Sequence, residues 1–329
     1  MKYREAIAQT TVDLMEADPR IVILGAGVTD PKGIFGTTLL ARQRFPDRVI
    51  ETPLSENMLT GALAGLASNG YKPIYVHARS EFALLGMEHL VNTIAKWPWL
   101  HGGQQLPIVI RMLVGRGWGQ GPTHSQAFPA MFASVPGLMV RYPVYPGTVG
   151  SHLAHAVKRG LPTLFIEPRR MYEQADLMEF ENRGADVRIV TIGDCILDAK
   201  QAVEEMMGRV KVTIDAYEDF SKPLHMLGMP TLVVDSMPVR FGAAAELMAG
   251  LIELGCPRVA RLGAQFTPCP TAPGLESQWY PSVEDIKLAI YKLLGRNVSP
   301  PPRSLPLPPD YARKAVISLF DRNRQKEPF

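Results

Sequence analysis

Residues 52–77 read TPLSENMLTGALAGLASNGYKPIYVH, and they carry the signals of a helix followed by a strand. Small and apolar residues follow Glu56 with a pattern that predicts a helix over residues 56–68. The apolar run at residues 73–76 has the length and content of a buried strand. A helix that leads directly into a buried strand is the repeating unit of α/β proteins with parallel sheets.

The same alternation extends over the first half of the chain. Short apolar runs predict strands at residues 21–25, 73–76, 107–111, 138–140 and 163–166. The stretches between them predict helices at residues 3–17, 56–68, 84–97, 127–134 and 147–159. Strands that alternate with helices indicate crossover connections and a mostly parallel sheet that is covered on both faces.

A second α/β unit is predicted from about residue 184. Its expected strands and helices cover residues 187–193, 197–207, 210–214, 231–235, 242–254 and 282–294. Ser282 is a favourable N-cap for the last of these helices, and Glu284 and Asp285 follow in its first turn. The proline-rich residues 299–309 predict a polyproline-type linker, and residues 311–320 predict a short final helix.

Composition restricts the class of protein. A chain of 329 residues suggests about two domains, and its 46% hydrophobic content is enough for a sizeable core. The net charge of +3 is too small for a nucleic-acid-binding surface. Cys195, Cys256 and Cys269 have no metal-binding spacing, and an odd, sparse count fits a reducing compartment. With no apolar run of 18 residues and no signal-peptide pattern at the start, we expect a soluble, cytoplasmic protein that binds neither membrane nor nucleic acid.

Two segments carry residues that are typical of catalysis. Glu56, at the start of a helix rich in small residues, is either a first-turn glutamate stabilised by the helix dipole or a buried functional carboxylate. Gly61 and Gly65, four residues apart in that helix, would let another backbone approach closely. The second segment, residues 111–126, follows a strand and alternates glycines with polar residues. Its His124 is either a proton-transfer group or an ordinary loop histidine.

Several motifs, in this order and spacing, resemble one known family. They are TPLSE (52–56), LVNTIAKW (90–97), HGGQ (101–104), GPTHSQ (121–126), IEPRRMY (166–172) and YPSVEDI (280–286). They resemble the β subunit of the thiamine-diphosphate-dependent 2-oxo acid dehydrogenases, which are the pyruvate, branched-chain and acetoin dehydrogenase components. The resemblance implies a pyrimidine-binding domain over residues 1–183, a transketolase C-terminal-type domain over residues 184–296, and a linker and tail over residues 297–329.

The resemblance also implies roles for three residues. Glu56 matches the glutamate that contacts the aminopyrimidine of thiamine diphosphate and drives its shift to the imino tautomer. Phe82 matches an aromatic residue that packs against the pyrimidine ring. His124 matches a histidine that faces the substrate. Because the cofactor carries the carbanion chemistry, such a protein contributes orientation and electrostatics.

A partner chain is implied for the other half of the cofactor. The family's signature for the diphosphate and its Mg²⁺ is Gly-Asp-Gly followed by paired asparagines. This chain has only Gly193-Asp194-Cys195, in the second unit, with no asparagine pair behind it. The resemblance therefore implies no metal ligand in this chain and an α-type partner that brings the metal, in an α₂β₂ assembly.

The sequence departs from the family pattern near the expected pocket. Ala26 stands where the family usually has an acid of a chain thought to pass protons between active sites. Arg79 takes an apolar position in the segment VHARSEF (76–82). It fits either an ion pair with Glu81 or another acid, or an anion-binding group for the substrate. His77 of the same segment is a second candidate substrate residue.

The second unit also departs from the family pattern. At residues 215–225 the family's Asp-Leu-Arg-Thr and the long helix after it are missing or shortened. This leaves open whether the chain docks on a lipoyl acyltransferase. The leading function is decarboxylation of a 2-oxo acid with transfer of the acyl or aldehyde unit. The alternatives are a split transketolase-like or acyloin-forming carboligase acting on a ketol, and a non-catalytic paralogue that binds a partner.

Overall fold

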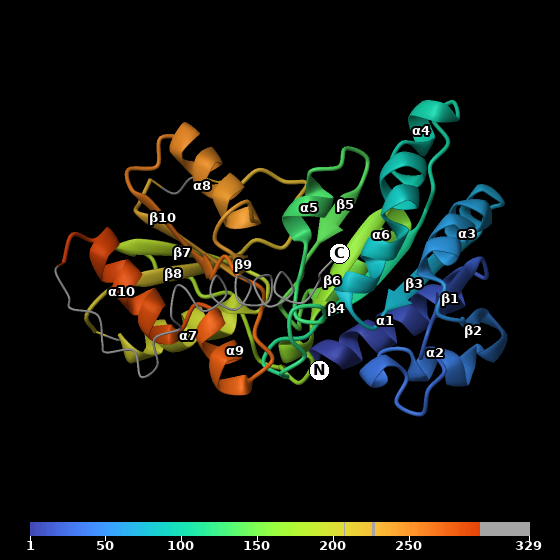
Figure 1. Cartoon of the computed structure of the whole chain (residues 1–329), viewed down its shortest axis with the longest axis horizontal. Coiled ribbons are helices and arrows are strands. Elements are labelled where there is room, and N and C mark those ends of the chain that lie inside the picture. Colours follow the sequence, from blue (N-terminus) through green and yellow to red (C-terminus); the bar gives the residue numbers. More distant parts are fainter. Residues whose placement is uncertain (207, 226–227, 297–329) are drawn as a thin grey trace, which may run out of the picture.

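The computed structural model describes residues 1–206, 208–225 and 228–296, and it contains two parallel sheets (Figure 1). The first sheet has the strand order β2-β1-β3-β4-β6-β5. Its strands are β1 (Ile21–Gly25), β2 (Val49–Glu51), β3 (Lys72–His77), β4 (Val109–Val114), β5 (Met139–Arg141) and β6 (Thr163–Pro168). All five neighbouring pairs run parallel, as the alternation of strands and helices predicts.

Both faces of this sheet are buried, which explains its continuous apolar strands. In β1, Ile21 and Ile23 enter one core while Val22 and Leu24 enter the other. Helices α1 (Tyr3–Ala17), α2 (Leu39–Arg44) and α6 (Val149–Arg159) pack on the first face. The second face is covered by α3 (Glu56–Ser68), α4 (Trp97–Leu100) and α5 (Pro129–Ala133).

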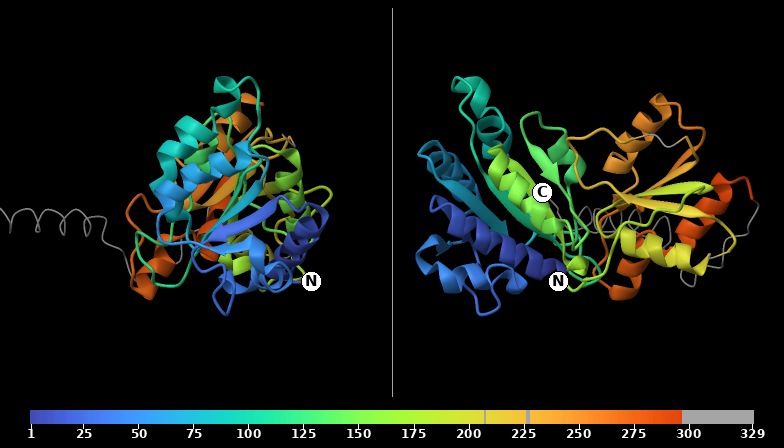
Figure 2. Two further views of the ribbon diagram at one scale, coloured as in Figure 1. Left: turned by 90° about the vertical axis from the view of Figure 1, so that its right-hand side faces the viewer. Right: turned by 180° about the vertical axis from the view of Figure 1, so that it is seen from behind.

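The second sheet repeats this arrangement on a smaller scale and has the strand order β10-β9-β7-β8. Its strands are β7 (Val187–Ile192), β8 (Val212–Ala216), β9 (Thr231–Pro238) and β10 (Val259–Ala264). Its helices are α7 (Cys195–Glu205), α8 (Ala243–Glu253), α9 (Pro273–Trp279) and α10 (Val283–Leu293). The two sheets lie side by side, and the view from behind shows the same separation (Figure 2). The predicted domain boundary at residues 183 and 184 falls between β6 and β7.

Most predicted elements are present, and one is wrong. The helices predicted at residues 3–17 and 56–68 have those bounds. Ser282 caps α10, because its hydroxyl accepts a hydrogen bond from the Asp285 amide at 3.1 Å. The single helix predicted at residues 84–97 is instead a 3₁₀ helix, η3 (Ser80–Gly86), a π-helix, η4 (His89–Ile94), and the short α4.

Close packing accounts for that break. Gly86 approaches α3 so closely that a Cβ there would lie 2.3 Å from the Thr60 hydroxyl. No local pattern predicted α2, β2, β10 or α9. The predicted linker and final helix lie outside the described residues. Among the described helices, none is long and apolar enough to cross a membrane.

The order of the strands fixes where a ligand can bind. From β1 the chain moves to β2 on one side, and β3 lies on the other side of β1. The loops that leave the carboxyl ends of β1 and β3 therefore diverge and leave a crevice between them. A parallel sheet of this kind binds ligands at such a switch point.

Candidate active site

A cavity of about 360 Å³ lies at this switch point. Three loops line it, and each leaves the carboxyl end of a neighbouring strand. They are the loop after β1, the segment after β3, and the glycine-rich loop after β4. The lining residues are Ala26, Gly27, Asp30, Lys32, Ile34, Phe35, Ala78, Arg79, Phe82 and His124. The topology thus brings together Phe82, Arg79 and His124, three of the site residues predicted from the sequence.

The wall that follows β1 is fixed by Glu51, at the end of β2. Its carboxylate accepts hydrogen bonds from the Gly27 amide at 2.5 Å and from the Thr29 amide at 2.9 Å. Burial opposes ionisation of Glu51, but these bonds prevail and lower its pKa. Farther along the wall, Ile34 and Phe35 have left-handed backbone angles, with φ of 42° and 57°. Strain of this kind in residues with side chains is concentrated at functional sites.

His124 and Phe82 meet on the opposite wall. Their rings pack edge to face with centroids 5.6 Å apart, and Nδ1 of His124 lies 2.8 Å from the Thr123 hydroxyl. Glu81 ties this loop to η3 by accepting a hydrogen bond from the Gln126 amide at 2.6 Å. Burial raises the pKa of Glu81. The His124 loop is therefore held against the segment that carries Phe82.

Arg79 lines the cavity without a carboxylate partner among the described residues, so the ion pair to Glu81 that the sequence allowed is not formed. Its Nε donates to the Gln120 side chain at 2.6 Å, and one terminal nitrogen donates to its neighbouring carbonyl. Burial, together with the charge of Arg169, lowers the pKa of Arg79. A half-buried guanidinium without a counter-ion favours an anionic ligand.

Trp118 links the two arginines. The guanidinium carbon of Arg79 lies 5.1 Å from the centre of a Trp118 ring, and that of Arg169 lies 5.5 Å away. Arg169 also packs on Phe35 and Tyr172, and its buried Nε has no hydrogen-bond partner within the described chain. This edge of the cavity is rich in cations that are shielded by aromatic rings.

Glu56 and His77, two further site residues predicted from the sequence, do not line this cavity. Glu56 is the first residue of α3, is half-buried, and has no partner for its carboxylate within the described residues. Burial raises the pKa of Tyr75, and the charge of Glu56 adds to that shift. His77 is buried in β3 beneath the Tyr75 ring, with ring centroids 4.4 Å apart. Burial lowers the pKa of His77 to about 3, so the ring is neutral at physiological pH.

The two glycines of α3 have different surroundings. Gly61 packs on the His89 ring, where an added Cβ would lie 3.0 Å from a ring atom. Gly65 is exposed and an added Cβ would meet nothing within 4 Å. The close approach of another backbone predicted for this helix is therefore not seen in the described chain: a side-chain ring packs on Gly61, and the space beside Gly65 is open.

A metal site is not visible in the described part of the chain, where no three His, Cys, Asp or Glu residues cluster suitably. Asp194 of the Gly193-Asp194-Cys195 sequence is buried and pairs with Arg116 and Arg170. This aspartate therefore has a structural role between the two sheets.

Sequence reasoning missed Glu51, Trp118 and Arg169 as parts of the site. Glu51 precedes the Thr52 motif, yet nothing local indicates that its carboxylate reaches back to a loop more than twenty residues earlier. Trp118 was visible as an aromatic residue between glycines of a loop after a strand. Arg169 also follows a strand end, and that position was an available signal.

Comparisons with known proteins agree with this architecture. The family model described as the transketolase pyrimidine binding domain matches residues 1–174, which is more than half of the chain. The pyruvate dehydrogenase E1 component subunit beta-1 of Arabidopsis thaliana, a mitochondrial protein, is 27% identical, and the match covers 90% of each chain. The beta subunit of the acetoin:2,6-dichlorophenolindophenol oxidoreductase of Cupriavidus necator is 29% identical and covers 89% of this chain and 97% of its own.

Solved structures show the same fold over both sheets. A split-gene transketolase, described as an inactive β4 tetramer, superposes with a TM-score of 0.71 at 19% identity and covers 90% of this chain and 98% of its own. The transketolase of Leishmania mexicana superposes with a TM-score of 0.69 at 19% identity and covers 92% of this chain and 46% of its own. With its parallel sheet and its cavity at the switch point, the chain belongs to the family of proteins that carry a transketolase-type pyrimidine-binding domain.

Proposed function

We propose that this chain is the β-type subunit of a two-chain thiamine-diphosphate enzyme that decarboxylates a 2-oxo acid and transfers the resulting acyl unit. The observation that carries the proposal is the cavity at the switch point of the pyrimidine-binding domain, with Phe82 and His124 on its wall. The similarity of the whole chain to beta subunits of pyruvate dehydrogenase and of the acetoin oxidoreductase supports it.

The residues present fit the pyrimidine half of thiamine diphosphate. Glu56 offers a carboxylate that no described residue engages, and Phe82 offers a half-exposed ring. An aminopyrimidine needs both a hydrogen-bonding carboxylate and a flat apolar surface. When bound, thiamine diphosphate supplies the carbanion chemistry. The described residues contain no suitable cluster for Mg²⁺, so we assign the metal and the diphosphate to an α-type partner.

Each residue of this chain has a distinct task in this proposal. With thiamine diphosphate bound, Glu56 would hold a hydrogen bond to the aminopyrimidine and favour its imino tautomer. Phe82 would pack against the pyrimidine ring. His124 exchanges a proton with the substrate. Arg79, which lacks a counter-ion, binds the substrate carboxylate. His77 is buried against Tyr75 in β3 and outside the described cavity, so we assign it no contact with the substrate.

The test of this function uses the full chain together with the α-type subunit of the same organism. The pair is supplied with thiamine diphosphate, Mg²⁺ and pyruvate, and reduction of 2,6-dichlorophenolindophenol reports oxidative decarboxylation. We expect dye reduction by the pair and none by either chain alone. Acyloin formation from pyruvate without dye reduction would instead assign the chain to a carboligase. No cofactor-dependent turnover with any 2-oxo acid or ketol would identify a non-catalytic paralogue.

The assembly and location follow from the same proposal. An α₂β₂ tetramer would place each pyrimidine site at an interface between unlike chains, and the exposed Gly65 lies on the helix that begins with Glu56. Sedimentation of the purified complex with a lipoyl acyltransferase decides whether the chain docks on such a protein, and cell fractionation tests the expected cytoplasmic location.

A further inference from the structure

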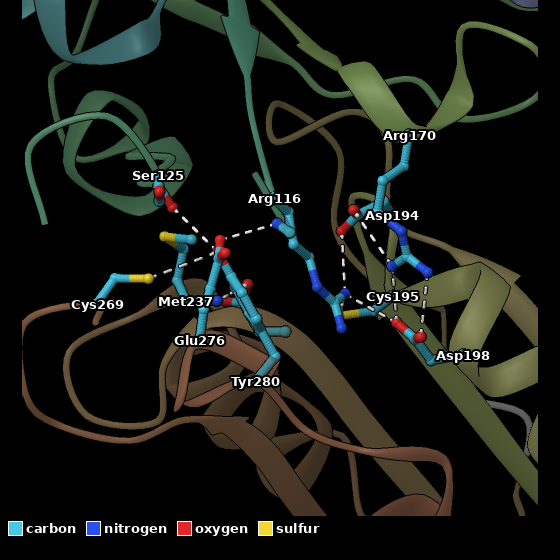
Figure 3. Close-up of polar contacts among 12 residues, drawn as sticks. Arg116, Ser125, Arg170, Asp194, Cys195, Asp198, Met237, Cys269, Glu276 and Tyr280 are labelled. Carbon is cyan, nitrogen blue, oxygen red and sulfur yellow. Dashed lines mark hydrogen bonds and ion pairs between the residues drawn. The ribbon is translucent and has the colours of Figure 1, made fainter. Parts of the chain in front are cut away.

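The glycine-rich loop, residues 115–127, is held from outside its own domain. The buried carboxylate of Glu276, in α9 of the second unit, accepts hydrogen bonds from the Gly117 amide at 2.8 Å and from the Gly119 amide at 2.7 Å. Glu276 is 1% exposed. Figure 3 shows it reaching from the second unit toward the loop. One side chain thus satisfies two backbone donors that are separated by a single residue.

Further contacts from the second unit follow along the same loop (Figure 3). Arg116 pairs with Asp198 at 2.8 Å and lies 4.3 Å from the centre of the Tyr280 ring. The Tyr280 hydroxyl donates to the Ser125 carbonyl at 3.4 Å. The loop is therefore anchored near both of its ends. Between these ends, Glu276 binds the amides of Gly117 and Gly119, on either side of Trp118.

The other side of the loop forms part of the active site. Gln120 holds Arg79, Trp118 lies against the same guanidinium, and His124 lines the cavity. All three residues lie on or just after the stretch that Glu276 binds. A shift of Gly117 and Gly119 would therefore move Trp118 and Gln120 away from Arg79.

The chemistry of the loop explains why it needs this acceptor. Gly117 and Gly119 have left-handed backbone angles, with φ of 80° and 64°, and they have no side chain to restrict other conformations. A carboxylate offers one oxygen to each amide, and bonds to a charged acceptor are stronger than neutral ones. A neutral or shorter side chain at position 276 would leave at least one of these two amides without its charged acceptor.

We propose that Glu276 is a positioning residue: it sets the conformation of the glycine-rich loop so that Trp118 and Gln120 hold Arg79 at the cavity and His124 lines it. The second unit thereby shapes the substrate side of a site that lies in the first. The consequence for turnover depends on the function proposed above. The effect on the loop itself does not.

The first experiment therefore needs no activity. Amide hydrogen exchange of the full chain, followed by mass spectrometry of peptides covering residues 115–127, is compared between the wild type and two variants. Glu276→Ala removes both acceptors and Glu276→Gln replaces one of them with a donor. We expect exchange in this segment to accelerate about tenfold or more in both variants, with Glu276→Ala the more affected.

Asp219→Asn is the matched control, because it weakens another buried link between the two units, the ion pair of Asp219 with Arg141 in β5, without touching the loop. We expect it to lower the melting temperature while leaving exchange in residues 115–127 within about threefold of the wild type. Unchanged exchange in both Glu276 variants, or equal acceleration in Asp219→Asn, would overturn the proposal.

The second experiment measures the consequence in the complex with the α-type subunit. Glu276→Gln should lower kcat/KM for pyruvate about 10²-fold, the scale of a misplaced catalytic group. Its affinity for thiamine diphosphate with Mg²⁺ should stay within about threefold, because Glu56 and Phe82 lie on other elements. Loss of cofactor affinity in proportion to activity would contradict the positioning role. A wild-type complex without turnover would refute the proposed function alone, since hydrogen exchange still decides the role of Glu276.

Discussion

The two parallel sheets of this molecule share an architecture and differ at their carboxyl edges. In the first sheet, the loops after β1 and β3 leave a cavity of about 360 Å³. In the second sheet, the edge formed by β7 and β9 is filled: Asp194 follows β7, is 5% exposed, and pairs with Arg116 and Arg170 of the first domain. Asp235, near the end of β9, is also buried.

The switch point of a parallel sheet can therefore form a ligand site or an interface, and the side chains at that edge decide which. Where small residues such as Ala26 and Gly27 follow a strand, the crevice stays open for a ligand. Where an aspartate meets arginines from a neighbouring domain, the same crevice becomes an interface. Substitutions at the first edge should therefore change catalysis. Substitutions at the second edge should change the stability of the fold.

The largest expected effect is on catalysis at the open edge. In the complex with the α-type subunit, Glu56→Gln should lower kcat by roughly 10²–10⁴, the scale of a group that handles a proton. The melting temperature should stay close to that of the wild type, because the carboxylate has no partner in the described chain. Glu246→Gln is the matched control, since Glu246 is also a first-turn glutamate, in α8. Equal turnover in both variants would make Glu56 an ordinary helix-start residue.

Substitutions at the filled edge should lower the free energy of unfolding. Asp194→Ala leaves Arg116 and Arg170 without one buried partner, and breaking a buried pair in this way costs about 3–5 kcal/mol. Urea denaturation of the full chain measures the loss in free energy of unfolding. Asp13→Ala, at an exposed position of α1, should change it by less than about 0.5 kcal/mol. A similar small change for Asp194→Ala would remove the contrast between the two edges.

A pH dependence should also come from the filled edge. Burial raises the pKa of Asp235 from 3.8 to about 6, so the folded protein holds this proton more tightly than the unfolded chain does. The stabilising contribution is therefore complete below pH 4 and is lost as the pH rises through about 6, by up to about 3 kcal/mol. Asp235→Asn should gain stability relative to the wild type between pH 4 and pH 7, as measured by urea denaturation at each pH. A constant difference over this range would contradict the assignment.

The smallest predicted effect concerns substrate choice at the open edge. Arg79→Leu should raise KM about tenfold for an anionic substrate, equivalent to about 1.4 kcal/mol, and leave KM for a neutral analogue unchanged. The melting temperature should change little, because Arg79 has no carboxylate partner in the described chain. An unchanged ratio of the two KM values together with a clear fall in melting temperature would show that Arg79 is structural.

Much of the first sheet could be predicted because its elements carry local signals. The apolar runs of β1 and β6 have the pattern of buried strands, and the helix after Glu56 has a clear period. Prediction failed where tertiary packing decided the local structure. Gly86 approaches Thr60, and the helix predicted at residues 84–97 is broken there. Strand β2 has only three residues, Val49–Glu51, and is too short to be recognised from its pattern.

The candidate site could be predicted only in part, for a similar reason. His124 lies within the motif GPTHSQ, and Arg79 and Phe82 lie in the segment VHARSEF, which departs from the family pattern. The fold brings all three to one cavity. Glu51 and Glu276 act through backbone amides that are distant in sequence, and no local pattern marks an acceptor for a distant loop. Contacts of this kind depend on tertiary structure alone.

The affinity for thiamine diphosphate with Mg²⁺ decides whether this chain holds only one half of a cofactor site. Calorimetric titration is performed on the isolated chain, on the α-type subunit, and on their complex. We expect the complex to bind at least about 100-fold more tightly than either chain, a difference of about 2.7 kcal/mol or more. Equally tight binding and turnover by the isolated chain would contradict it.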